Sequence, residues 1–228
     1  MLPLNDADPN RYSRIPFMTL ALILVNTAIL FWELSLPGDM LQAVFYLFGS
    51  TPSLTWARQG AGLISSITSM FLHGGMFHLF GNMLFLWVFG RRVEDACGPI
   101  RFLLFYLLAG ISSDLLTALV LPRQDIPGIG ASGAIFGVMG AYLLLFPEGR
   151  IRTLWFLYLI PTWPQIRAVW FIFYYLGIQI IPAVNIYLHG AQYSVGYWAH
   201  IGGFVSCFAI LLFLRPEAFA RYMSNVGV

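Results

Sequence analysis

A serine that could act as a nucleophile stands inside an otherwise apolar stretch of this 228-residue sequence. Ser132 belongs to a Gly-Ala-Ser-Gly segment that begins at Gly130. A serine hydroxyl is a weak nucleophile until a neighbouring base takes its proton, and a neutral ring nitrogen of His200 could do so. The alternative reading is helix packing, because small residues such as Gly133 and Gly137 let membrane helices approach closely.

Two further polar residues could stabilise the negative charge that such an attack creates. His78 and Asn82 are four residues apart and therefore share one face of a helix. N–H groups aimed at a developing oxyanion lower the barrier of the reaction. Asn82 can donate at any pH, whereas His78 must present an N–H in either its neutral or its charged form. With a serine and a base nearby, these residues predict nucleophilic catalysis.

A metal site is the competing chemistry. His73, His78 and His200 could in principle hold zinc. No carboxylate stands beside them in the sequence, however, and Cys97 and Cys207 form no metal-binding pattern. We therefore expect neither a metal nor another cofactor.

The composition indicates what kind of element positions these residues. The chain is 59% hydrophobic and only 10% charged, whereas soluble domains are about 45–50% apolar and about 25% charged. The mean hydropathy is +0.76, which indicates a polytopic membrane protein. All 12 basic residues are scattered arginines, so no basic patch predicts nucleic-acid binding.

Six apolar runs are long enough to be membrane spans, which need about 20 residues. They cover residues 15–32, 75–89, 100–121, 131–146, 167–183 and 198–214. We therefore predict an all-α six-helix membrane domain over residues 15–214, between a cytoplasmic segment 1–14 and a cytoplasmic tail 215–228. The run 154–160 is too short to cross and is expected at the interface. The connection 35–72 is expected to sink partly against the bundle.

The arginines predict the orientation of this domain. Ten of the 12 fall on one side of a six-span arrangement, and only Arg58 and Arg123 fall on the other. Because arginine marks the cytoplasmic side, both termini are expected there. The second, fourth and sixth spans then start at the outer side. Their first turns bring the polar residues of the predicted site to one depth.

At these residues the sequence resembles the rhomboid family of intramembrane serine proteases. Four stretches carry the resemblance: His-Gly-Gly-Met-Phe-His-Leu-Phe-Gly-Asn at 73–82, Arg-Arg-Val-Glu-Asp at 91–95 with the following 101–106, Gly-Ala-Ser-Gly-Ala-Ile-Phe-Gly at 130–137, and Trp-Ala-His-Ile-Gly-Gly at 198–203. The resemblance implies a six-helix bundle with a water-filled cavity open to the outside. It also implies a dyad of Ser132 and His200.

Further roles follow from the same resemblance. It implies an oxyanion and substrate-binding site of His78, Asn82, Gly130, Ala131 and the Ser132 backbone N–H. Supporting residues are expected at four positions: His73, which would brace the long first loop, and Gly133, Phe136 and Trp198. Phe136 stands where the family often has tyrosine, so a hydroxyl near the base is missing here.

The resemblance also implies partners and a location. Substrates would be membrane proteins with a single span, cut in or near its outer part within the lipid bilayer. The sequence favours a bacterial cytoplasmic membrane, because no appended domain or transit peptide is evident, and it predicts no oligomeric state. The runner-up functions are a catalytically silent relative that binds membrane clients and a small transporter.

Two features carry further expectations. Asp114, in the third span, could orient His200 as a third triad member, or could bond structurally to Ser112, Ser113 or a neighbouring helix. The fifth span is bulky and aromatic, and it is followed by a loop at 185–197 without charged residues. We expect this span and loop to form a mobile gate beside the second span.

Overall fold

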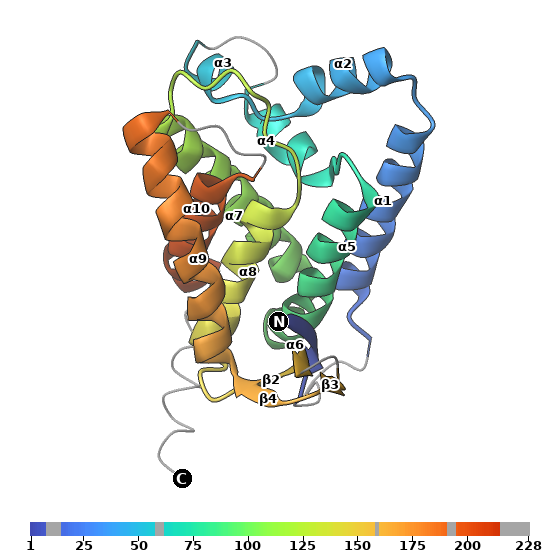
Figure 1. Cartoon of the computed structure of the whole chain (residues 1–228), viewed down its shortest axis with the longest axis vertical. Coiled ribbons are helices and arrows are strands. Elements are labelled where there is room, and N and C mark those ends of the chain that lie inside the picture. Colours follow the sequence, from blue (N-terminus) through green and yellow to red (C-terminus); the bar gives the residue numbers. More distant parts are fainter. Residues whose placement is uncertain (8–14, 58–61, 158–159, 191–194, 215–228) are drawn as a thin grey trace.

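The computed structural model describes residues 1–7, 15–57, 62–157, 160–190 and 195–214. The fold is mostly helical (Figure 1). The helices are α1 (Phe17–Leu34), α2 (Gly38–Phe48), α3 (Pro52–Ala57), α4 (Leu63–Thr68), η1 (Ser69–Phe71), α5 (Met76–Phe85), the π-helical η2 (Leu86–Gly90), α6 (Arg91–Cys97), α7 (Pro99–Val120), α8 (Ser132–Leu145), α9 (Ala168–His189) and α10 (Tyr197–Leu214).

Three of the described helices are long and apolar enough to cross a membrane: α1, α7 and α9. A fourth span results if the segments Ile64–Phe71 and Met76–Cys97, bent by 100°, are counted as one. α8 and α10 are shorter apolar helices. The protein is thus an integral membrane protein. Each of the six predicted runs overlaps one of these helices, while the number of actual crossings stays a prediction.

α8 is the central helix of the bundle. Every residue from Gly133 to Tyr142 is buried, and the helix packs against α7 and α10. Glycines make the contact with α10 unusually close. A Cβ placed on Gly203 of α10 would lie only 1.9 Å from the carbonyl oxygen of Gly133. The two backbones therefore touch directly along this seam.

A small sheet closes one end of the bundle, which we call the sheet end. Strand β2 (Arg150–Leu157) pairs antiparallel with β1 (Leu2–Asp6), β3 (Ile160–Thr162) and β4 (Gln165–Arg167). This sheet departs from the all-α expectation, and residues 154–157 and Ile160 of the run 154–160 belong to its strands. Along β2, exposed Arg150 and Arg152 alternate with buried Ile151 and Thr153. A period of two is that of a strand, which explains why this segment is not helical.

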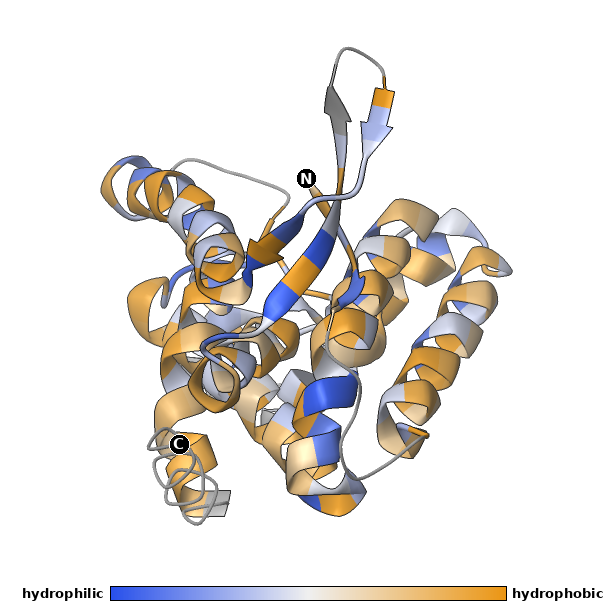
Figure 2. Ribbon diagram, turned by 90° about the horizontal axis from the view of Figure 1, so that it is seen from below, coloured by the Kyte–Doolittle hydropathy of each residue, from blue (hydrophilic) through white to orange (hydrophobic). Residues whose placement is uncertain are grey.

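The hydrophilic positions of the strands stand out against the apolar helices when the molecule is seen from the sheet end (Figure 2). Arginines of α6, β2 and β4 lie here. At the opposite end of the bundle lie α2, α3 and α4, which we call the loop end (Figure 1). α3 and α4 contact α7, as expected for the first connection. α2 buries none of its residues and exposes Met40, Tyr46 and Leu47.

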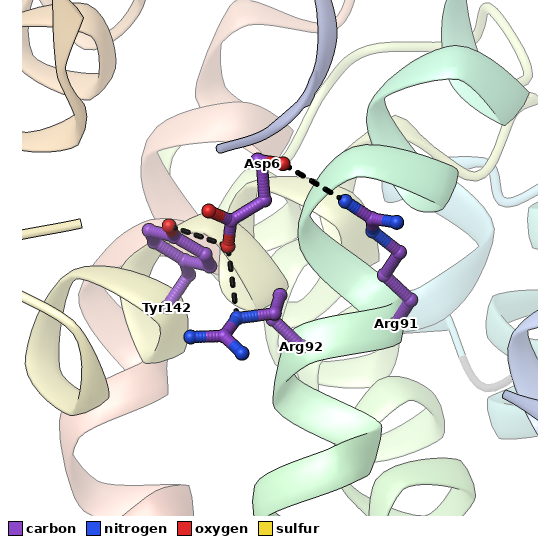
Figure 3. Close-up of polar contacts among 4 residues, drawn as sticks. All are labelled: Asp6, Arg91, Arg92 and Tyr142. Carbon is purple, nitrogen blue, oxygen red and sulfur yellow. Dashed lines mark hydrogen bonds and ion pairs between the residues drawn. The ribbon is translucent and has the colours of Figure 1, made fainter. Parts of the chain in front are cut away.

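The strand β1 is fastened by a buried charge cluster. Asp6 is 2% exposed, and its Oδ2 lies 2.9 Å from Arg92 Nε and accepts a 2.8 Å hydrogen bond from the Tyr142 hydroxyl (Figure 3). Arg91 donates to the Asp6 carbonyl oxygen over 3.1 Å. Because a buried carboxylate is costly unless paired, these partners hold β1 against α6 and α8.

Candidate active site

The candidate nucleophile is the first residue of α8. Ala131 precedes the helix, and its carbonyl accepts the first intrahelical bond, from Ile135 N. The Ser132 N–H therefore belongs to the first turn, whose amides have no carbonyl to bond within the helix. Gly130 adopts φ +116°, which brings the chain sharply into the helix. The positive end of the α8 dipole therefore lies at Ser132.

His200 faces this serine from the neighbouring helix α10. Its Nε2 lies 2.8 Å from Ser132 Oγ, and its side chain is buried. Phe136, one turn along α8, stacks on the imidazole with ring centroids 4.4 Å apart and planes 10° apart. The ring packs flat without the hydroxyl of a tyrosine. The predicted nucleophile and base are therefore in hydrogen-bond contact.

A residue that the sequence analysis did not single out completes the surroundings of His200. Gln179 of α9 is buried, and its Oε1 lies 2.8 Å from His200 Nδ1. The signal for it was available, because a glutamine in the middle of an apolar span requires a polar partner. The sequence could not say which partner, since it does not show which face of α9 turns toward α10.

His78 and Asn82 approach the nucleophile segment from α5. A Cβ on Gly130 would lie 2.6 Å from His78 Nε2 and 3.5 Å from Asn82 Nδ2, so only glycine leaves room for both. Asn82 is buried, and its Nδ2 has no hydrogen-bond partner among the described residues. A buried amide donor without a partner costs free energy. It is available for an anion that forms beside Gly130.

The tautomer of His78 follows from its other contact. Its Nδ1 lies 3.2 Å from the His73 carbonyl oxygen, which can only accept a hydrogen bond. The Nδ1 must therefore carry a proton. In the neutral ring Nε2 is then an acceptor, so His78 can donate from Nε2 only as the imidazolium. The sequence-based expectation allowed His78 to donate in its neutral or its charged form, whereas the structure allows Nε2 to donate only in the charged form.

Glu33 fixes the turn from which α5 starts. This carboxylate at the end of α1 is 1% exposed and accepts the backbone N–H of His73 at 3.0 and 3.2 Å. The His73 ring is fully buried, with Nδ1 3.4 Å from the Phe71 carbonyl oxygen. His73 is thus bonded to the end of the first connection, where it was expected to act as a brace.

A cavity of about 220 Å³ opens beside the nucleophile. His78, Gly130, Ser132 and Asp114 are among its lining residues. A second cavity of about 710 Å³ near the loop end shares Asp114 and Gly128 with it. Polar groups in the walls provide partners for water, which hydrolysis requires.

Asp114 lines the cavity, but the hydrogen bond of its side chain goes to the first connection. Its Oδ2 accepts a 3.3 Å hydrogen bond from Ser69 Oγ, and Ser69 in turn accepts the Gly130 N–H through its carbonyl over 2.8 Å. Asp114 therefore bonds to a neighbouring helix, and Gln179 occupies the position on His200 Nδ1 that a third triad member would take.

Two further predicted residues, Trp198 and Gly133, join helices at the cavity walls. Trp198 donates from Nε1 to the Ala183 carbonyl over 2.9 Å and ties α10 to α9. A Cβ on Gly133 would collide with Ser113 Oγ at 2.0 Å, so this glycine lets α8 pack closely on α7.

The gate was expected where the fifth span lies beside the second span. There Tyr175 of α9 packs edge-on against Phe85 of α5, with ring centroids 5.0 Å apart. Residues 191–194 of the expected lid lie outside the described part of the chain.

The described residues contain no group of three or more His, Cys, Asp or Glu side chains placed to hold a metal ion. Both ring nitrogens of His200 are engaged by protein oxygens, one on Ser132 and one on Gln179. The geometry at this histidine is that of a base with a hydroxyl partner.

Comparisons with known proteins extend over the same region. A family model described as "Rhomboid domain" matches residues 61–217. RHOMBOID-like protein 6, mitochondrial, from Arabidopsis thaliana is 33% identical over 170 residues, 73% of this chain and 50% of that protein. RHOMBOID-like protein 2 from the same plant is 34% identical over 185 residues, 75% of this chain and 52% of that protein.

A bacterial relative is also similar. Rhomboid protease GluP from Bacillus subtilis (strain 168) is 35% identical over 142 residues, which are 62% of this chain and 24% of that protein. The chain thus spans about half or less of the length of these relatives. The matched family region includes every residue of the site described above except Glu33.

Proposed function

The chain belongs to the rhomboid family, and from this premise we propose that it is an intramembrane serine endopeptidase with a dyad of Ser132 and His200. The observation that carries the proposal is the 2.8 Å contact between Ser132 Oγ and His200 Nε2 beside a polar cavity. Contact between nucleophile and base is the geometry that nucleophilic catalysis needs.

In the proposed reaction, Ser132 Oγ attacks the scissile carbonyl carbon while His200 Nε2 takes the hydroxyl proton. The tetrahedral intermediate collapses when the protonated His200 gives that proton to the leaving amine. A water molecule then attacks the acyl-serine, with His200 again accepting a proton, and Ser132 is regenerated. General acid–base catalysis of this kind contributes about 10²–10⁴-fold to the rate.

The oxyanion of the intermediate is proposed to form between α8 and α5. Its donors are the Ser132 N–H in the first turn of α8 and the Asn82 amide, which has no partner in the described part of the chain. His78 adds a third donor when its ring is charged. These groups are fixed before substrate arrives, which is why such donors stabilise charge in the transition state.

We also propose the topology and the class of substrate that the sequence predicts. The chain would cross the membrane six times with both termini in the cytoplasm, and would cut single-span proteins near the outer part of their span. A substrate helix hides its carbonyls in its own hydrogen bonds and must unwind before attack. The bacterial cytoplasmic membrane stays a prediction, because the relatives come both from a bacterium and from a plant, one of them with a mitochondrial name.

The test uses purified protein in detergent and in vesicles. A fluorophosphonate should label wild type at Ser132, and vesicles should show cleavage of a single-span reporter. Ser132→Ala and His200→Ala should each abolish turnover, and the double variant should lose little more than either single one, because dyad members act as a unit. Ser35→Ala serves as the matched control, since its exposed hydroxyl bonds the Trp32 carbonyl at the end of α1.

Turnover of the reporter by purified Ser132→Ala would refute the serine mechanism. A folded wild type that binds the reporter but neither cleaves it nor takes the label would instead identify a client-binding relative.

A further inference from the structure

Gln179 makes two hydrogen bonds that fix its side-chain amide in one orientation. Its Nε2 donates to the Tyr175 carbonyl over 2.8 Å, and its Oε1 lies 2.8 Å from His200 Nδ1. A flipped amide would place an oxygen against the Tyr175 carbonyl, where both atoms only accept. The oxygen must therefore face His200.

This orientation determines where the proton of His200 lies. An amide oxygen accepts, so Nδ1 must carry the N–H. In a neutral ring Nε2 then presents its lone pair, and Ser132 Oγ lies 2.8 Å from it. The stacked Phe136 fixes the plane of the ring, but a phenyl ring cannot select between the two tautomers. Gln179 makes the only polar contact to Nδ1 among the described residues.

We propose that Gln179 is a positioning residue for the reaction, which holds neutral His200 in the tautomer that can take the serine proton. The proposal rests on the proposed serine protease function and extends the dyad to a neutral Ser–His–Gln arrangement. Each proton transfer leaves the Nδ1–H bond to Gln179 intact, so the ring keeps its orientation as base and then as acid.

The fold makes this contact depend on a third helix. Ser132 comes from α8, His200 from α10 and Gln179 from α9. Ala183 lies one turn beyond Gln179 on α9, and its carbonyl accepts a hydrogen bond from Trp198 of α10. This bond is a second link between α9 and α10. A displacement of α9 away from α10 would release Nδ1, so the position of α9 enters the chemistry at His200.

The first test is the reactivity of Ser132 toward a water-soluble fluorophosphonate. Gln179→Leu keeps the bulk but removes the acceptor, and it should slow labelling and lower kcat, leaving KM nearly unchanged. The loss should lie between about 10-fold and about 10⁴-fold, the latter being the cost of a wrong tautomer in a serine protease triad. Gln179→Glu retains an acceptor oxygen in either protonation state and should restore labelling to within about tenfold of wild type, since it keeps the bond to Nδ1.

Two controls distinguish the positioning of His200 by Gln179 from a purely structural link between α9 and α10. Trp198→Phe removes the other α9–α10 side-chain bond and should slow labelling far less than Gln179→Leu. Thermal midpoints identify any variant that fails to fold, and Gln179→Met then replaces Gln179→Leu. The inference falls if Gln179→Leu labels like wild type, if Gln179→Glu is as slow as Gln179→Leu, or if Trp198→Phe is equally slow.

The second test reads the tautomer directly and needs no substrate. In ¹⁵N-histidine-labelled protein near neutral pH, the His200 signals, assigned by their loss in His200→Ala, should show a protonated Nδ1 and an unprotonated Nε2. Gln179→Leu should shift both toward a mixture. A wild-type Nε2 that carries the proton would overturn the inference. Failure of wild type to label at Ser132 would remove the proposed function itself, whereas equal labelling of wild type and Gln179→Leu would remove this inference alone.

Discussion

The two ends of α8 are held in place by different chemistry. At its first residue, Ser132, the partner is the imidazole of His200, and glycine backbones bring α8 and α10 together. At its other end, Tyr142 bonds the carboxylate of Asp6, which is paired with Arg92 in a buried site (Figure 3). One helix thus joins a polar catalytic end, which we call the Ser132 end, to a charged anchor.

The difference shows what each end requires. Near Ser132 the separation of nucleophile and base depends on how closely α8 and α10 approach, and glycines set this by backbone contact. At the sheet end a strand must be fastened to a bundle, and a buried ion pair does so because removing one partner leaves the other uncompensated. The family match begins at residue 61, so it covers the seam but not Asp6.

The largest effect is expected from breaking the glycine seam. In Gly203→Ala the new Cβ would lie 1.9 Å from the Gly133 carbonyl oxygen, which belongs to the backbone and cannot move aside. Overpacking costs about 1–3 kcal/mol when side chains can adjust, and the loss here should exceed that range. Thermal unfolding in detergent and Ser132 labelling should both show it.

The same substitution on α9 is its control. A Cβ on Gly177 would meet nothing within 4 Å, so Gly177→Ala should be neutral or stabilising, by up to about 1 kcal/mol from helix propensity. Equal thermal midpoints for the two variants would show that the seam does not determine the packing of α8.

The next largest effect concerns the oxyanion donor at the Ser132 end. Asn82→Ala should lower kcat by about 10²–10³-fold with little change in KM, because the amide would bond only the charged intermediate. Asn26→Ala, which removes another buried asparagine on α1, should leave kcat near wild type. Wild-type turnover by Asn82→Ala would leave the Ser132 N–H and charged His78 as the donors.

Much of the Ser132 end could be predicted from the sequence, and little of the charged end. The Ser132–His200 contact joins segments whose residue types carry the chemistry, so the pattern alone pointed to both. Gln179 was missed because a single glutamine in an apolar helix does not reveal which face it turns to α10. The sheet was missed because strand pairing joins residues as distant along the chain as Leu2 and Leu154, and no local pattern fixes such a register.

The smallest effect is expected at the charged end, from Tyr142→Phe. This change removes one 2.8 Å bond to Asp6 but leaves the ion pair with Arg92. A hydrogen bond to a charged group contributes about 1.5–3 kcal/mol, so the thermal midpoint should fall. Because the seam at the other end of α8 is untouched, labelling of Ser132 in the folded fraction should proceed at the wild-type rate. Tyr46→Phe, at an exposed position of α2, should change neither quantity. A slower labelling rate in folded Tyr142→Phe would mean that the anchor adjusts the catalytic end along α8, and that the two regions are coupled.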